Sequence, residues 1–381
     1  MNPIVVIGSG LAGYNLARNL RKFDKAVALT IVTADQGEFY SKPMLSEAFA
    51  AAKTPEMLVN KTAEQMASQL GAQIQTRSSV QRVHPGDHEI ELDDHRLRYS
   101  KLVLALGADA IHPPFAGDGA AGVLSVNDLN DYARFRAAVL GRKRILIVGA
   151  GLIGCEFSND LASAGYHVDV VDIAPQPLGR LLPPAGGAML NKSLASLGIG
   201  WHLGTAVQSI GRSGAAYRVR LANGEAIDID VVLSAIGLKP RTALAASAGL
   251  RTDRGIVVNR LLETSDPDIY ALGDCAEVEG LVLPFTTPIM HAAKALASTL
   301  AGKPTALRYP AMPVVVKTPA CPTVVAPPPA GMAGEWQVSA SSDGVRALCV
   351  DGTGTLLGYA LNGSAARENH ALTAQLPVWL S

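Results

Sequence analysis

The sequence predicts an α/β protein with two parallel-sheet domains built on one pattern and a small third α/β domain after residue 309. Three observations predict this class. A glycine-rich turn between a buried strand and a helix occurs twice, the segments after each turn repeat, and short strand-like runs fill the C-terminal part. The length of 381 residues also suits two or three domains, at roughly 150 residues each.

Composition narrows the class of function before any motif is considered. Hydrophobic residues make up 48% of the chain and charged residues 17%, which excludes a disordered protein. Lys plus Arg total 33 and Asp plus Glu total 33, so we expect no nucleic-acid partner. No apolar stretch is long enough to cross a membrane, and a strand that begins at Ile4 leaves no room for a signal peptide. We therefore expect a soluble, cytoplasmic protein with no membrane insertion.

The first element is a short apolar strand, Ile4 to Ile7, typical of a buried parallel strand. A glycine-rich turn follows it and opens a helix: Gly8-Ser9-Gly10-Leu11-Ala12-Gly13. Gly8 permits the tight turn, Gly10 lets the backbone approach a pyrophosphate, and Gly13 lets the helix pack on the strand. The helix N-terminus offers unpaired N–H groups to phosphates. A second strand, Ala28 to Val32, completes a βαβ unit of the Rossmann type.

The same pattern returns in the middle of the chain. The strand Ile145 to Val148 leads into a second turn, Gly149-Ala150-Gly151-Leu152-Ile153-Gly154. The next strand, Val168 to Val171, ends at Asp172, where a carboxylate accepts hydrogen bonds from an adenine-ribose hydroxyl. No Arg follows directly to receive a 2′-phosphate, which favours NADH over NADPH. One such turn is a weak signal, but two complete units predict two dinucleotide sites.

The repeat extends beyond the two glycine turns. Each copy continues with a hairpin, which Asn223-Gly224 marks in the second copy. Each copy then closes on a strand that runs into a glycine, Gly107 in the first and Gly237 in the second. Internal similarity of this length indicates two related nucleotide domains in one chain.

A third motif follows the second copy, Thr264-Ser265-Asp266-Pro267-Asp268-Ile269-Tyr270-Ala271-Leu272-Gly273-Asp274-Cys275-Ala276. With the two turns, it resembles the pyridine-nucleotide–disulfide oxidoreductase superfamily, whose fold is glutathione-reductase-like. The resemblance implies FAD in the first copy, NADH in the second, and a bond from Asp274, beside Gly273, to the ribityl chain. It also implies an FAD domain of residues 1–112 and 241–308, an NADH domain of 113–240 and a C-terminal domain of 309–381.

One position departs from the superfamily pattern. The first copy's second strand usually ends in Glu, whereas this chain has Thr33-Ala34-Asp35. The resemblance therefore implies that either Thr33 or Asp35 binds the adenosine ribose of FAD, and the residues leave the choice open.

Within the superfamily, the chain most closely resembles the bacterial rubredoxin reductases. Two segments carry this resemblance, Tyr40-Ser41-Lys42-Pro43-Met44-Leu45-Ser46 and Val316-Lys317-Thr318-Pro319-Ala320-Cys321-Pro322. In such enzymes, lysines of both segments and a glutamate after the second turn lie beside the flavin. The resemblance implies that Lys42 and Glu156 pair near flavin N5 as catalytic residues. It also implies that Lys317 contacts the flavin or nearby backbone.

The four cysteines decide which reactions are open. Disulfide reductases need paired cysteines at the flavin, and peroxide-reducing relatives need one shortly after the second strand, but residues 39–46 contain none. Cys155, Cys275 and Cys349 suit packing, and Cys321 keeps a functional contact as an alternative. No cysteine has metal-ligand spacing, so we expect no metal site.

These features predict an enzyme that passes electrons from NADH through FAD to the iron of rubredoxin, as in alkane-hydroxylase electron chains (alkane degradation). The alternatives are an NADH-dependent ferredoxin reductase, a thiol-linked peroxide or disulfide reductase, and a flavoprotein with a redox-sensed binding role. The sequence leaves the oligomeric state undecided.

Overall fold

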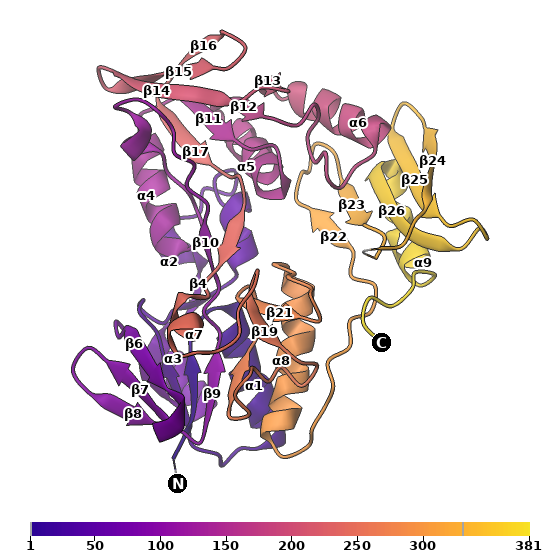
Figure 1. Ribbon diagram of the computed structural model, residues 1–381. Coiled ribbons are helices and arrows are strands. Elements are labelled where there is room, and N and C mark those ends of the chain that lie inside the picture. The colour runs from indigo at the N-terminus through magenta and orange to yellow at the C-terminus, as the bar shows by residue number, and fades with distance from the viewer. Residues whose placement is uncertain (1, 330) are drawn as a thin grey trace.

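The first unit of the fold is built on a parallel sheet. The computed structural model describes residues 2–329 and 331–381. The five strands of this sheet, in spatial order, are β20 (Ile269–Ala271), β9 (Lys101–Leu104), β1 (Ile4–Ile7), β2 (Leu29–Val32) and β5 (Gln73–Gln75). The first two strands of the chain are fully buried, as their continuous apolar runs require. Helices α1 (Leu11–Phe23) and α8 (Thr286–Leu300) pack against each other on this sheet (Figure 1).

Smaller elements complete the first unit. A three-stranded antiparallel sheet lies at its outer side (Figure 1) and contains β6 (Val80–His84), β7 (Glu89–Leu92) and β8 (Arg96–Arg98). The remaining pieces are β3 (Phe39–Tyr40), a 3-10 helix η1 (Lys42–Glu47), α2 (Pro55–Leu58), β4 (Val59–Lys61), α3 (Ala63–Leu70), α7 (Ala243–Ser247), β19 (Ile256–Val258) and β21 (Ala276–Val278). The helix α3 begins with a capping box between Thr62 and Gln65, which satisfies its first N–H groups.

The second unit repeats the parallel pattern. Its sheet contains, in spatial order, β13 (Gly200–Leu203), β12 (His167–Asp172), β11 (Arg144–Val148) and β17 (Val231–Ser234). An antiparallel sheet extends from it, made of β14 (Val207–Ser213), β15 (Ala216–Leu221) and β16 (Ala226–Ile229). Its helices are α4 (Leu129–Val139), α5 (Leu152–Ser163) and α6 (Pro184–Ala195). Two glycine turns between parallel strands and helices are confirmed, and with them the predicted α/β class.

The chain crosses between these two units twice, and the two crossings lie side by side (Figure 1). They form an antiparallel ladder of β10 (Ala108–Ala110) and β18 (Leu238–Pro240). Arg241 donates a hydrogen bond to Asp109 at 2.6 Å across this ladder. The crossing is therefore held by main-chain and side-chain bonds together.

The segment after β3 leaves the core of its own unit. Leu45, Phe49 and Leu58 are buried among residues of the second unit. The Phe49 ring packs edge-on against the rings of Tyr132 and Phe135 on α4, each at 5.4 Å between ring centroids. The apolar residues after β3 thus find their packing partners on the neighbouring unit, across the boundary that the sequence analysis expects at residue 112.

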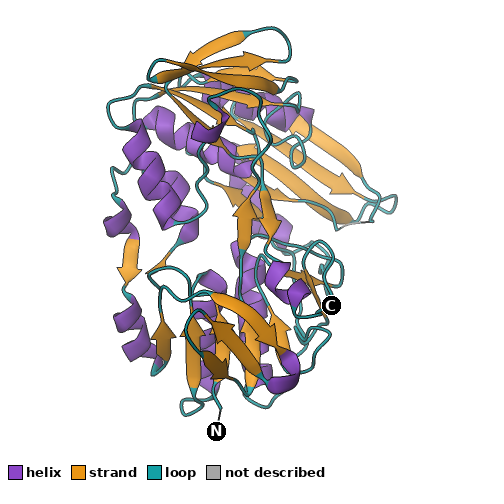
Figure 2. Cartoon of the chain, turned by 60° about the vertical axis from the view of Figure 1, so that its left-hand side comes forward, coloured by secondary structure: helices purple, strands orange, loops and turns teal. Residues whose placement is uncertain are grey.

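The third unit is a five-stranded antiparallel sheet. Its order is β22 (Val314–Val316), β23 (Thr323–Ala326), β26 (Leu356–Gly363), β25 (Gly344–Val350) and β24 (Glu335–Ala340), followed by the short helix α9 (Asn369–Thr373). In Figure 1 this sheet, drawn in orange and yellow, lies apart from the two parallel sheets, and Figure 2 shows the chain turned, with its strands in orange. The chain end returns to the linker before β22, where Tyr309 O accepts hydrogen bonds from Trp379 N and Leu380 N. Every helix within the described ranges is too short or too polar to cross a bilayer.

Candidate functional site

The first glycine turn is shaped by close backbone approaches. Gly8 has φ +112°, and a Cβ there would lie 2.2 Å from the carbonyl oxygen of Ala105. A Cβ at Gly13 would lie 2.0 Å from the carbonyl oxygen of Gly8. A Cβ at Gly10 would meet nothing within 4 Å, and no side chain caps the start of α1. The turn thus leaves open space at uncapped N–H groups, which fits a pyrophosphate.

A small polar network lies beside this turn. The Ser9 hydroxyl is 3.0 Å from Thr33 Oγ1 and 3.2 Å from Asp35 Oδ1. Asp35 Oδ1 also accepts from Thr33 Oγ1 at 2.7 Å and from Gly37 N at 2.8 Å. Thr33 is buried, whereas Asp35 is exposed. The three contacts of Asp35 all use its Oδ1, so its Oδ2 has room for an outside donor.

The third motif brings a carboxylate to the same place. Gly273 has φ +82°, and a Cβ there would lie 2.8 Å from Ala12 Cβ, so this turn contacts the first turn of α1. The next residue, Asp274, has Lys42 Nζ 3.9 Å from its Oδ2. Burial raises the pKa of Asp274, and Lys42 partly opposes this. Within residues 2–329 and 331–381, no hydrogen bond reaches this carboxylate, which fits an acceptor for ribityl hydroxyl groups of FAD.

Lys42 is the cation of this site. Burial lowers the pKa of its ammonium, while Asp274 raises it and Arg241 lowers it further. The 3.9 Å separation from Asp274 is longer than a hydrogen bond. Lys42 therefore supplies positive charge without being held tightly by that partner.

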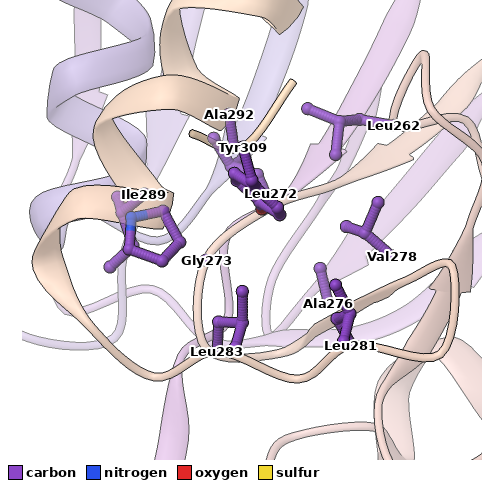
Figure 3. Close-up of a pocket in the computed structure, with 11 residues that line it drawn as sticks. Leu262, Leu272, Gly273, Ala276, Val278, Leu281, Leu283, Ile289, Ala292 and Tyr309 are labelled. Carbon is purple, nitrogen blue, oxygen red and sulfur yellow. The ribbon is translucent and has the colours of Figure 1, made fainter. Parts of the chain in front are cut away.

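An apolar pocket lies behind Gly273, between the start of α8 and the loops around β20 and β21 (Figure 3). Leu283, Ile289 and Tyr309 are among the residues that line it. The pocket contains neither Asp274 nor Lys42. Because its lining side chains are apolar except for Tyr309, it is a packing feature next to the site.

The second glycine turn has the same shape. Gly149 has φ +110°, and a Cβ at Gly154 would lie 1.8 Å from the carbonyl oxygen of Gly149. Gly151 is open, like Gly10 in the first turn. Asp172 Oδ2 accepts a hydrogen bond from Ala150 N at 2.5 Å, and its Oδ1 accepts one from Ala174 N at 2.7 Å. The carboxylate is thereby oriented at the mouth of the turn.

The two closing glycines lie at opposite ends of the crossing ladder. Gly107 O accepts a hydrogen bond from Arg241 N, and Gly237 O accepts one from Ile111 N. Both glycines have positive φ, +71° and +127°, so both are turns into the crossing strands. Their place at the boundary between the units is compatible with cofactor contacts from either side.

The predicted pairing of Lys42 with Glu156 is wrong. Glu156 Oε2 accepts from Lys317 Nζ at 2.7 Å and from Ser46 Oγ at 2.6 Å, and its Oε1 accepts from Lys317 N at 3.1 Å. Lys42 instead lies beside Asp274. The reason is the direction of η1, whose first residue faces the loop after β20 while Ser46, one turn later, faces α5. Lys317 also donates to the carbonyl oxygen of Pro43, a backbone contact beside Lys42.

Helix α5 contributes two further residues that the sequence analysis missed. Asp160 accepts from Phe49 N at 2.8 Å and Ala50 N at 2.9 Å, and Asn159 Oδ1 accepts from Ala320 N at 3.1 Å. Burial raises the pKa of Asp160, although these N–H groups oppose the shift. The available signal was spacing: polar residues at i, i+3 and i+4 of one helix share a face. Here that face joins all three units.

The cysteines lie in packed surroundings. All four have free thiols and are buried. Burial raises the pKa of Cys275 to about 11 and raises the pKa of Cys155 as well. Cys275 Sγ lies 3.4 Å from the carbonyl oxygens of Leu104 and Leu272, so its thiol is engaged with backbone. Cys321 is buried beside Thr318 and Thr323. Over the described part of the chain, no cluster of three His, Cys, Asp or Glu side chains could hold a metal ion.

Similarity to known proteins extends over nearly the whole chain. Residues 2–299 match the family model described as pyridine nucleotide-disulphide oxidoreductase, and residues 306–376 match the one described as rubredoxin binding C-terminal domain. The chain is 47% identical to a rubredoxin-NAD(+) reductase of Alcanivorax borkumensis, with 99% of each chain covered. It is 46% identical to a rubredoxin-NAD(+) reductase of Acinetobacter baylyi, over 99% of this chain and 98% of that one.

A solved structure shares the fold throughout. The reductase in a covalent putidaredoxin reductase–putidaredoxin complex superposes with a TM-score of 0.88, at 25% identity, and covers 99% of this chain and 94% of its own. The match includes all three units described above.

Proposed function

The chain belongs to the pyridine nucleotide-disulphide oxidoreductase family, and from this premise we propose that it is an FAD-dependent NADH:rubredoxin oxidoreductase. The observation that carries the proposal is the combination of two open dinucleotide turns with a third unit that matches a rubredoxin-binding model. A protein with this combination can take electrons from one nucleotide and deliver them to a small iron protein. The reaction suits a cytoplasmic NADH pool and an electron chain such as alkane hydroxylation.

FAD fits the first unit. Gly10 and the start of α1 would receive its pyrophosphate, Asp35 Oδ2 its adenosine ribose, and Asp274 its ribityl chain. Bound FAD supplies a ring that accepts a hydride and releases electrons singly. The ammonium of Lys42, beside Asp274, places positive charge where a reduced ring needs it.

NADH fits the second unit. The open backbone at Gly151 would receive its pyrophosphate, and Asp172 would accept hydrogen bonds from its adenosine ribose. The carboxylate disfavours a 2′-phosphate by charge repulsion, which supports NADH over NADPH. Glu156, on the helix that begins at this turn, joins the two nucleotide units through Ser46.

The buried thiols support an iron acceptor over a thiol acceptor. Cys155, Cys275 and Cys321 are each nearly inaccessible, and none lies on η1, where a thiol would face the first site. Electrons therefore leave through an outside partner. Rubredoxin is the partner that the third unit's similarity supports.

The test is anaerobic NADH oxidation by the FAD-loaded protein with rubredoxin, with a [2Fe–2S] ferredoxin and with a free dye. We expect the highest kcat/KM with rubredoxin, and we expect thiol alkylation to leave it unchanged. A higher kcat/KM with ferredoxin would assign the protein to ferredoxin reduction. Loss of activity on alkylation would instead favour a thiol-linked peroxide or disulfide reductase.

A further inference from the structure

We propose that Ser46 is a positioning residue for flavin reduction, because its hydroxyl completes a clasp that holds Lys42 in place. The clasp consists of Ser46, Glu156 and Lys317, one residue from each structural unit. The proposal rests on the proposed function in one respect, since it requires FAD in the first unit. It adds a residue and a role that the similarity to known reductases does not supply.

The Ser46 hydroxyl is used on both sides. It donates to Glu156 Oε2 at 2.6 Å and accepts from Lys317 Nζ at 2.6 Å. Ser46 is 3% exposed and Glu156 is 1% exposed, so water does not compete for these bonds. A hydroxyl offers one proton and two lone pairs, which matches these two charged neighbours. An alanine there would leave both charges with a missing partner.

The ammonium of Lys317 is directed to η1. Its three N–H groups match three acceptors within the chain: Glu156 Oε2, Ser46 Oγ and the carbonyl oxygen of Pro43. Pro43 follows Lys42 directly, and Ser46 lies three residues after Pro43. Lys317 therefore holds η1 at two points, Pro43 O and Ser46 Oγ, the first of them next to the residue that carries the site's positive charge.

Lys42 depends on this grip because its own contacts are weak. Its side chain is 38% exposed, and its ion pair with Asp274 is 3.9 Å long. A single long ion pair does not fix a flexible lysine side chain. The position of its backbone, which the clasp sets, determines where the ammonium can reach. Loss of the Ser46 hydroxyl should thus displace Lys42 without removing it.

The experiment compares FAD-loaded variants by anaerobic stopped-flow reduction with NADH and by flavin midpoint potential. For Ser46→Ala we expect the limiting reduction rate to fall about tenfold, because a displaced Lys42 ammonium no longer places its positive charge where a reduced ring needs it. The NADH dissociation constant should remain within twofold. If the reduced flavin is stabilised tenfold less, the two-electron potential falls by about 30 mV.

Two further variants test whether the loss depends on the Ser46 hydroxyl. Ser46→Thr keeps the hydroxyl and should restore most of the rate and the potential. Ser158→Ala is the matched control: Ser158 is fully buried on α5 and donates only to Cys155 O at 2.9 Å, so rate and potential should stay at wild-type values. If Ser46→Ala does not retain FAD, Ser46→Gly also removes the hydroxyl without introducing a thiol and should give the same loss.

A wild-type rate and potential in Ser46→Ala would overturn the proposal. Equal losses in Ser46→Ala and Ser158→Ala would also overturn it, because the effect would then be one of packing. The rate of flavin reduction by NADH and the flavin potential are measured without an electron acceptor. The result therefore does not depend on whether rubredoxin is the acceptor. Failure of the wild-type chain to bind FAD would refute the proposed function instead.

Discussion

The two glycine turns of this protein share a backbone but differ in how a carboxylate reaches them. Gly8 and Gly149 have φ values of +112° and +110°, and each donates its N–H to a carbonyl oxygen of the neighbouring strand, Val32 O and Val171 O. Gly10 and Gly151 are both open. The backbone requirements of a dinucleotide turn are therefore met twice in the same way. The side chains around the turns are where the two units diverge.

The clearest difference is the position of the acidic residue beside each turn. Asp172 directly follows Val171, and its structural counterpart after Val32 is Thr33. In the second unit the carboxylate bonds the turn's own N–H, whereas in the first unit Asp35 contacts the turn through Ser9. The Ser9 hydroxyl thus connects the first turn to Asp35, which lies two residues after Thr33, the counterpart of Asp172.

The helices after the turns also differ in their partners. Helix α1 packs on α8 within its own unit, whereas α5 presents polar side chains to both other units. The second turn is therefore built into a junction, and the first is not. If this junction depends on the shape of the second turn, a substitution in that turn should also disturb the contacts of α5 with the other two units.

The largest effect should come from filling the closest approach in each turn. Gly154→Ala places a carbon 1.8 Å from a carbonyl oxygen and should cost about 3 kcal/mol locally, abolishing reduction by NADH while FAD is retained. Gly13→Ala should instead remove FAD. The measurements are flavin absorbance and stopped-flow reduction, with Gly86→Ala, which has open space, as control. Loss of FAD in Gly154→Ala would show that the two units are not separable.

The next effect concerns the direct carboxylate. Asp172→Ala should raise the KM for NADH about tenfold with little change in kcat, because charged hydrogen bonds contribute about 1.5–3 kcal/mol. Asp169→Asn is the control on the same strand, since Asp169 faces His202 at 3.0 Å and not the turn. An unchanged KM in Asp172→Ala would remove NADH from the second unit.

The relayed carboxylate should matter to FAD in a graded way. Asp35→Ala should raise the dissociation constant of FAD about tenfold, because it removes a carboxylate whose Oδ2 is free to accept a bond from the ribose. Thr33→Val should change it by less than about threefold, since a neutral hydrogen bond is worth about 1 kcal/mol. Fluorescence titration of the apoprotein measures both. A larger loss in Thr33→Val would assign the ribose contact to Thr33.

The smallest expected effect concerns the ends of the two parallel sheets that lie opposite the glycine turns. The residue before β9 is Ser100, which bonds Pro3 O, and the residue before β17 is Asp230, which pairs with Arg144 at 2.9 Å. The Arg144 side chain holds the pKa of Asp230 at about 2, below its usual 3.8. The pair thus stabilises the fold above pH 3.8, and this contribution is lost as the pH falls through 2.

Asp230→Asn should lower stability by about 1 kcal/mol at pH 7, a modest value because Arg144 is half exposed. Urea unfolding at several pH values measures it, and the difference from wild type should shrink below pH 3.8. Ser100→Ala should show a pH-independent difference. A constant difference for Asp230→Asn down to pH 2 would exclude the ion pair as its cause.

The sequence was most informative where backbone geometry decides. The glycine turns, their flanking strands and the five short strands after residue 309 follow from local residue types, and the structure contains them. The clasp could not be predicted, because Ser46, Glu156 and Lys317 are distant in sequence and meet only when three sheets are placed. The Lys42–Glu156 pairing failed for the same reason: a motif identifies residues near a site, but the direction of η1 decides which of them touch.

The ladder of β10 and β18 has a consequence for protein engineering. Ala110 and Leu238 are direct partners across this ladder, so the entry and exit of the second unit are adjacent. A tight two-residue turn could join them and excise the intervening chain. The shortened protein would have to replace the surface that Phe49 now buries against α4. With that surface made polar, the first unit becomes a minimal flavin carrier to which other electron donors can be fused.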